Sequence, residues 1–156
     1  MNAERQAAIV IAVDPGTVKC GVAVVCGPPA AVLFKTIVAC EDLIDAVRPH
    51  MERHGVIAAL VVGDGTGSRR VADSLSAAFA PVKICLVNEH ATSEAARARY
   101  CLVHPPRGWR RFLPRGLRVP EEPYDDYVAV ILAERWLAGR GKAADGTDAG
   151  GVPNSA

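Results

Sequence analysis

Long apolar runs are missing from this chain of 156 residues. None approaches the roughly 20 apolar residues that an α-helix needs to cross a bilayer, so we expect no membrane span and no membrane partner. Residues 1–6 are polar and mixed in charge, without the apolar stretch of a secretory signal. These absences predict a soluble, cytoplasmic protein.

Paired cysteine motifs are missing as well. The sequence has no Cys-x-x-Cys pair, and its histidines do not supply closely spaced partners, so no zinc site is expected. Most cysteines lie inside apolar segments, which predicts reduced thiols packed in a core. The cysteines are Cys20, Cys26, Cys40, Cys85 and Cys101.

Acidic residues are absent from one long stretch, although the net charge of the whole chain is only +1. Between Ala95 and Pro120 there are seven arginines and no Asp or Glu. The proline-rich residues 104–123 predict a long basic loop. Arginines beside Trp109 and Phe112 can neutralise phosphates while the aromatic rings stack on bases, so we expect a nucleic-acid-binding loop. A merely solvated surface is the alternative.

Apolar residues make up 50% of the chain, enough for the core of one domain. Apolar periodicity predicts strands at residues 8–13, 20–26, 31–37, 56–63 and 82–87, and helices at about residues 41–54, 69–79, 93–101 and 124–137. Pro49 is expected to kink or split the first helix.

The spacing of these elements predicts an α/β fold. Short connections favour antiparallel pairing of the first three strands, and the later alternation of helix and strand favours parallel pairing. The expected architecture is a mixed five-stranded sheet, three antiparallel strands followed by βαβα, with helices on both faces. It forms a single domain of residues 1–138, followed by a disordered tail of residues 139–156.

Three acids stand at the ends of predicted strands. Asp14, Asp64 and Glu89 each follow an apolar run. Ligand sites in such sheets form where the carboxyl ends of neighbouring strands meet, so an acidic cluster is predicted. Asp14, just before a Pro-Gly turn, is the first candidate; a simple turn hydrogen bond is its alternative explanation.

Carboxylates without cysteines or grouped histidines select Mg²⁺ or Mn²⁺. Two such ions about 4 Å apart can activate a water and stabilise the leaving oxygen during phosphodiester cleavage. Because the acids accompany an arginine-rich loop, the sequence favours phosphodiester chemistry on a nucleic acid.

Four segments in order carry a resemblance to a known family. They are Asp14-x-Gly16-x-x-Lys19-x-Gly21, residues 61–66, residues 88–93, and residues 125–136 with Asp125 at their start. They resemble motifs of the YqgF/RuvX family, the Holliday-junction-resolvase-like proteins of the ribonuclease H-like superfamily, and the resemblance covers about residues 9–137.

The resemblance implies a ribonuclease H-like fold and a nuclease that uses two Mg²⁺ or Mn²⁺ ions. Family members are associated with maturation of the 16S ribosomal RNA precursor and with resolution of branched DNA. Carried over by the resemblance, Asp14 would bridge the metals, Glu89 would be the second ligand, and Asp125 would complete the catalytic set.

Two positions of this acidic set stay open. Asp64 stands where the family has a Leu-Pro dipeptide. In related resolvases the second acid follows this strand, so the resemblance also allows Asp64 to share or replace the role of Glu89. Asp125 and Asp126 are adjacent in a helix and lie about 100° apart, so only one can face the site. The resemblance selects Asp125, although acids in a first helical turn are also ordinary dipole partners.

Departures from the family motif concern activity more than fold. Asn88 and His90 replace the usual Asp and Arg of the third segment. A catalytically silent module that binds nucleic acid or protein is therefore the main alternative. A phosphotransferase of the actin and sugar-kinase type is a third hypothesis, but those enzymes need two such domains.

The predicted nucleic-acid partner is a structured RNA or a branched DNA. The predicted binding residues are Lys19, Arg107, Arg110, Arg111, Arg115 and Arg118. The sequence leaves open whether the protein is a monomer or a homodimer.

Overall fold

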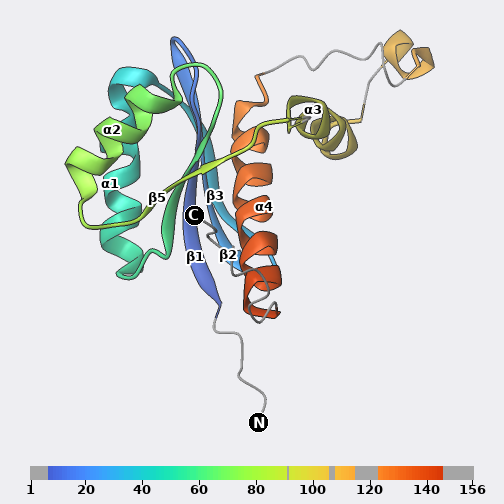
Figure 1. Ribbon diagram of the computed structural model, residues 1–156. Helices are drawn as coiled ribbons and strands as arrows, with labels where there is room; N and C mark the ends of the chain where they lie inside the picture. Colours follow the sequence, from blue (N-terminus) through green and yellow to red (C-terminus); the bar gives the residue numbers. More distant parts are fainter. Residues whose placement is uncertain (1–6, 91, 106–107, 115–122, 146–156) are drawn as a thin grey trace, which may run out of the picture.

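One mixed sheet forms the centre of the computed structural model, which describes residues 7–90, 92–105, 108–114 and 123–145 (Figure 1). Strand β1 (Ala8–Asp14) pairs antiparallel with β2 (Lys19–Gly27), and β2 pairs antiparallel with β3 (Ala31–Ala39). On its other side β1 pairs parallel with β4 (Ala59–Gly63), which pairs parallel with β5 (Ile84–Val87). The strand order is β3-β2-β1-β4-β5, so the predicted mixed five-stranded sheet is confirmed.

Helices follow the strands in the expected alternation. The short 3₁₀ helix η1 (Cys40–Asp42) leads into α1 (Leu43–His54), and α2 (Ser68–Phe79) connects β4 to β5. After β5 come α3 (Thr92–Val103), the 3₁₀ helix η2 (Gly108–Phe112) and α4 (Asp125–Asp145). The η2 helix gives part of the predicted basic loop a regular structure.

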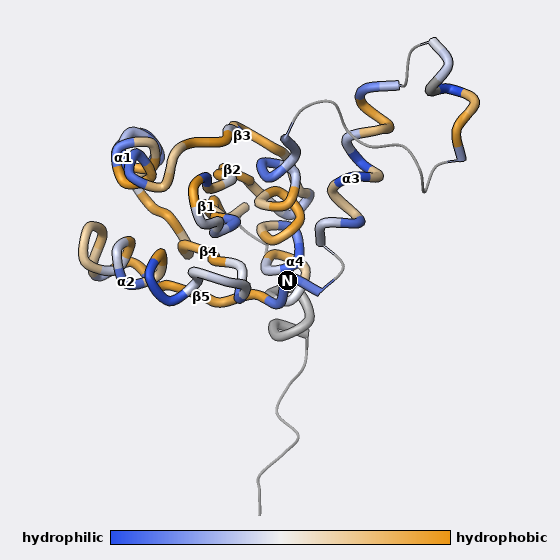
Figure 2. The backbone as a smooth tube through the Cα atoms, turned by 90° about the horizontal axis from the view of Figure 1, so that it is seen from above, coloured by the Kyte–Doolittle hydropathy of each residue, from blue (hydrophilic) through white to orange (hydrophobic). Residues whose placement is uncertain are grey.

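The helices cover opposite faces of the sheet (Figures 1 and 2). One face, here called the α1–α2 face, packs against α1 and α2. Its buried strand residues are Ile11, Val13, Cys20, Val22, Val24, Leu60 and Val62. The other, the α4 face, packs against α4 with α3 beside it, and its buried strand residues are Val10, Ala12, Ala23, Val25, Ala59 and Val61. Burial on both faces explains why the β4 segment is apolar without alternation.

Pro49 does not split its helix. Residues Leu43–His54 form one continuous α1 with Pro49 in its interior, so the split, one of the two expected outcomes, is wrong. Proline removes one backbone donor, but Leu43 and Val47 still anchor the helix in the core.

The last helix is longer than its sequence pattern indicates. It ends at Asp145 rather than Leu137, so the predicted tail, residues 139–156, begins inside α4. The apolar periodicity stops near Leu137 because the helix leaves the core there, not because the helix ends. Residues 146–156 lie outside the described residues.

Over the ranges given above, no helix has both the length and the apolar character to cross a bilayer.

Candidate functional site

The carboxyl ends of three neighbouring strands bring the predicted acids to one edge of the sheet. Asp14 is the last residue of β1, Asp64 directly follows β4, and Glu89 lies two residues after β5. Because β1, β4 and β5 run parallel, their ends lie side by side. Topology alone therefore gathers these acids.

Two glycines shape the place where the Glu89 carboxyl group lies. A Cβ atom at Gly63 would collide with Glu89 Oε1, and a Cβ atom at Gly65 would collide with Oε2. Any side chain at these positions would therefore displace the Glu89 carboxylate. The Gly-x-Gly spacing that begins at the last residue of β4 is the sequence signal for this close approach, and the sequence interpretation missed it.

The backbone of Glu89 is held by neighbouring polar groups. Its N–H donates to Asp64 Oδ1 at 3.0 Å. Its carbonyl accepts from the hydroxyl of buried Thr92 at 2.6 Å and from the Thr92 N–H at 2.9 Å. The Asp64 side chain is exposed and supports the Glu89 backbone, whereas the Glu89 carboxyl group interacts with Asp14.

In the loop between β5 and α3, Asn88 has a structural role. The Asn88 side-chain oxygen accepts a hydrogen bond from the His90 N–H at 2.6 Å. The Asn88 carbonyl accepts from Arg135 Nη1 of α4 at 2.8 Å. Asn88 therefore works as a turn residue, and Arg135 and Thr92 are supporting residues that the sequence interpretation missed.

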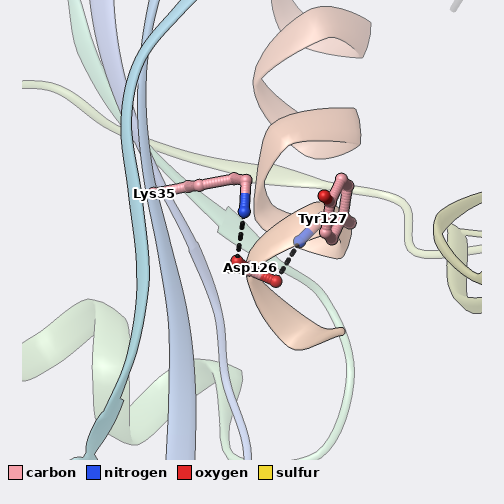
Figure 3. Close-up of polar contacts among 3 residues, drawn as sticks. All are labelled: Lys35, Asp126 and Tyr127. Atoms are coloured by element: carbon pink, nitrogen blue, oxygen red, sulfur yellow. Dashed lines mark hydrogen bonds and ion pairs between the residues drawn. The ribbon is translucent and has the colours of Figure 1, made fainter. Parts of the chain in front are cut away.

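Asp125 and Asp126, at the start of α4, take different directions. Asp126 Oδ2 forms an ion pair with Lys35 Nζ of β3 at 2.8 Å, and Asp126 Oδ1 accepts from the Tyr127 N–H at 2.9 Å (Figure 3). Burial would lower the pKa of Lys35, but the Asp126 carboxylate raises it above the ordinary value. Asp125 instead acts electrostatically on Asp14. This difference follows from the 100° between consecutive helical residues.

Gly21 permits α4 to approach this edge of the sheet. Gly21 is the antiparallel partner of Asp14, and a Cβ atom on it would collide with the backbone carbonyl of Asp125. The first turn of α4 therefore lies directly on β2 beside Asp14. The motif glycine has a steric role in the site.

Asp14 is in an unusual electrostatic environment. The pKa of Asp14 is raised from 3.8 to about 7. Burial is the largest cause of this shift, and the negative charges of Glu89 and Asp125 add to it. Glu89 Oε1 is buried and has no hydrogen-bond partner among the described residues. A proton or a cation between Asp14 and Glu89 would relieve this repulsion.

The carboxylate oxygens of Asp14 and Glu89 supply part of the ligand set of a hard cation. Carboxylate oxygens are ligands that Mg²⁺ and Mn²⁺ accept, and the unpartnered Glu89 Oε1 offers a free lone pair beside Asp14. Over the described ranges, no three His, Cys, Asp or Glu side chains are already arranged to hold a metal ion. Asp14 and Glu89 thus form the core of the candidate site, and Asp125 contributes its charge from α4.

The predicted basic residues are only partly described. Lys19 is exposed at the start of β2, and the Arg111 guanidinium lies 5.0 Å from the centre of the Phe112 ring within η2. The exposed rings of Trp109 and Phe112 lie in the same helix. Arg107, Arg115, Arg118 and the side chain of Arg110 lie outside the described residues.

Three solved structures share this architecture. RuvC of Thermus thermophilus has a TM-score of 0.54 at 17% identity, over 89% of this chain and 97% of RuvC. The same protein in complex with a Holliday junction substrate has a TM-score of 0.52, also at 17% identity, over 89% and 96%. Fowlpox virus resolvase bound to Holliday junction DNA has a TM-score of 0.58 at 9% identity, over 85% and 98%.

These similarities establish the fold. The α/β chain has the ribonuclease H-like architecture of the Holliday junction resolvases, as the sequence predicted. No sequence-family model matches the chain, and no curated protein sequence matches it.

Proposed function

We propose that this protein is a nuclease that depends on a divalent metal and hydrolyses phosphodiester bonds of a nucleic acid. The observation that carries the proposal is the half-buried pair Asp14–Glu89, in which the pKa of Asp14 is raised to about 7 and the buried Oε1 of Glu89 lacks a hydrogen-bond partner among the described residues. Such perturbed acids gather at functional sites, because a core without a function would replace them with apolar residues.

In this proposal Asp14 and Glu89 hold Mg²⁺ or Mn²⁺, and Asp125 completes the set. Bound metal would activate a water for attack and stabilise the leaving oxygen. The chain itself keeps Glu89 in place through Asp64, Thr92 and the two glycines, and brings Asp125 close through Gly21. Asp14 must lose its proton before it can act as a ligand.

The substrate class follows from fold and charge together. Two of the similar structures hold Holliday junction DNA, and those proteins resemble this chain over most of its length. The resemblance to the YqgF/RuvX family adds a ribosomal RNA precursor as a second candidate. We propose Lys19, Arg107, Arg110, Arg111, Arg115 and Arg118 as the contacts to phosphates, because both substrates are polyanions.

A catalytically silent binding module is the second candidate. It is favoured by one observation: the described acids do not form a ready group of three ligands. Such a module would retain affinity for nucleic acid while showing no response to metal.

The deciding experiment measures cleavage of a four-way DNA junction and of a structured ribosomal RNA precursor. The wild-type protein is compared with Asp14→Asn in Mg²⁺, in Mn²⁺ and in chelator. We expect metal-dependent cleavage that falls in Asp14→Asn by more than the roughly 10- to 100-fold typical for loss of an outer-shell partner.

Asp73→Asn is the matched control, because it makes the same substitution at an exposed acid of α2. It should cleave like the wild type. Cleavage by Asp14→Asn at the wild-type rate would refute the nuclease site, whereas tight binding without any cleavage by the wild type would favour the silent module.

A further inference from the structure

Two cysteines meet beside the turn that carries Asp14. The sulfur atoms of Cys20 and Cys40 lie 3.4 Å apart. Cys20 is buried in β2, and Cys40 begins η1 directly after β3. The Cys40 N–H donates to the Val18 carbonyl at 2.9 Å, which continues the β2–β3 pairing and holds the two residues in register.

The same pair contacts the backbone of the candidate site. The Cys40 thiol donates to the Gly16 carbonyl at 3.3 Å, and Arg70 Nη2 donates to the same oxygen at 3.4 Å. Gly16 lies two residues after Asp14, inside the turn between β1 and β2. The state of the Cys40 sulfur therefore affects how this turn is held.

Solvent reaches one of the two sulfurs more easily than the other. Half-buried Cys40 lines a surface groove together with Thr17, Val18, Arg70 and Ser74. Cys20 is fully buried, and burial raises the pKa of its thiol to about 11. A small oxidant can thus reach Cys40 through the groove, and Cys20 stays protonated behind it.

We propose that Cys20 and Cys40 form an oxidisable dithiol that couples peroxide to the turn of the nuclease site. The Cys40 sulfur attacks hydrogen peroxide, the O–O bond breaks, and Cys40 becomes a sulfenic acid while one water is formed. The Cys20 sulfur then displaces the hydroxyl group, which leaves as a second water with the Cys20 proton. Two thiols and one peroxide give one disulfide and two waters.

The disulfide changes the turn because it has no S–H group. The Gly16 carbonyl loses its donor from Cys40 and keeps the contact from Arg70. This part of the inference rests on the proposed nuclease function: we expect cleavage to slow about tenfold, as for loss of one supporting contact at a metal site. A thiol reductant should restore the rate.

The first test is independent of catalysis. The full-length protein is treated with hydrogen peroxide, free thiols are alkylated, and intact mass and peptide mapping are measured. We expect two fewer alkyl groups than on the reduced, alkylated protein, and a peptide that links Cys20 to Cys40. Cys85→Ser should form the same link, whereas Cys40→Ser should not. Absence of the link in the wild type, or a link between other cysteines, would overturn the proposal.

The second test asks whether the Cys20–Cys40 disulfide affects the turn between β1 and β2. Amide hydrogen exchange of residues 16–19 should be faster in the oxidised than in the reduced protein, and this readout holds even if no cleavage is found. If cleavage is found, peroxide should slow the wild type and Cys85→Ser but not Cys40→Ser. Unchanged exchange in a fully linked protein would overturn the coupling, and it would leave the nuclease proposal intact.

Discussion

The two faces of the sheet are built from different residues. On the α4 face the buried strand positions mix valine with Ala12, Ala23 and Ala59. On the α1–α2 face the corresponding positions carry valine, isoleucine, leucine and one cysteine, with no alanine. Large branched side chains fill the space under α1 and α2, whereas small ones let the backbone of α4 come close to the strands.

The two faces also differ in what they contribute to the candidate site. The α4 face places Asp125 beside Asp14, through the contact of Gly21 with the first turn of α4. The α1–α2 face contributes no acid to this cluster, and its helices lie over a close-packed apolar layer. Gly21 and the small residues of this face let α4 pack closely against the sheet.

Gly21→Ala should have the largest effect, because it tests the close approach directly. The new methyl group would meet the Asp125 backbone carbonyl, which cannot rotate away as a side chain would. We expect the free energy of unfolding to fall by about 1–3 kcal/mol, as in overpacked cores, together with a loss of cleavage. Urea unfolding and the junction assay measure the two effects.

Gly139→Ala is the control for that variant. The same substitution in α4 meets no atom within 4 Å and should stabilise the helix by about 0.5–1 kcal/mol. Equal stability of Gly21→Ala and the wild type would contradict the proposed packing of α4.

The stability of the metal-free protein should depend on pH through Asp14, which lies beside α4. The pKa of Asp14 is raised from 3.8 to about 7 in the folded protein, so folding favours its protonated form. Its contribution to the free energy of unfolding is full below about pH 4 and is lost as the pH rises through about 7. Thermal unfolding of the metal-free protein from pH 4 to pH 8 measures this loss.

Asp14→Asn should remove this part of the pH dependence, and the exposed-acid variant Asp73→Asn should keep it. Mn²⁺ should stabilise the wild type more at pH 8 than at pH 5, because the proton competes with the metal for Asp14. A metal-free protein that becomes more stable as Asp14 ionises would contradict the raised pKa.

Two variants of Asp64 should show whether it only supports the Glu89 backbone or also binds the metal. If its carboxylate only accepts the Glu89 N–H, Asp64→Asn keeps an oxygen acceptor and should retain near wild-type metal affinity. Asp64→Ala removes the acceptor and should weaken metal binding and cleavage by about 10-fold. Titration calorimetry with Mn²⁺ measures the affinity, and equal losses in both variants would make Asp64 a ligand.

Loss of the Lys35 charge should have the smallest effect on the free energy of unfolding. Its ion pair with Asp126 is partly exposed, at 35% and 13% of the two side chains, so Lys35→Met should cost about 0.2–1 kcal/mol of unfolding free energy. A double-mutant cycle with Asp126→Asn isolates the pair. A coupling energy near zero would show that Gly21 and the apolar core alone hold the first turn of α4.

Much of the fold could be predicted from local patterns. The strands were expected within a few residues of their observed bounds, because apolar runs broken by Gly, Pro and charge mark strands under two layers of helices. The end of α4 could not be predicted this way. Beyond Leu137 the sequence has no apolar stripe and contains Gly139 and Gly141, which are poor helix formers, so local patterns predict an end there although α4 continues to Asp145.

The candidate site was predictable only in outline. Acids at the ends of parallel strands had to lie near one another, so Asp14, Asp64 and Glu89 were found together. Whether an acid offers its carboxylate to the site or to a neighbouring backbone depends on side-chain directions. Those directions are set by contacts between segments far apart in the sequence, such as Asp64 with Glu89 and Lys35 with Asp126.

By itself the sequence determined which segments become strands and helices, and which edge of the sheet collects acids, because apolar periodicity and chain direction are local properties. Only the tertiary structure decided that Glu89 faces Asp14, that Asp126 turns to Lys35, and that Cys20 meets Cys40. Each of these pairs joins separate elements, and its geometry exists only after the helices have packed on the sheet.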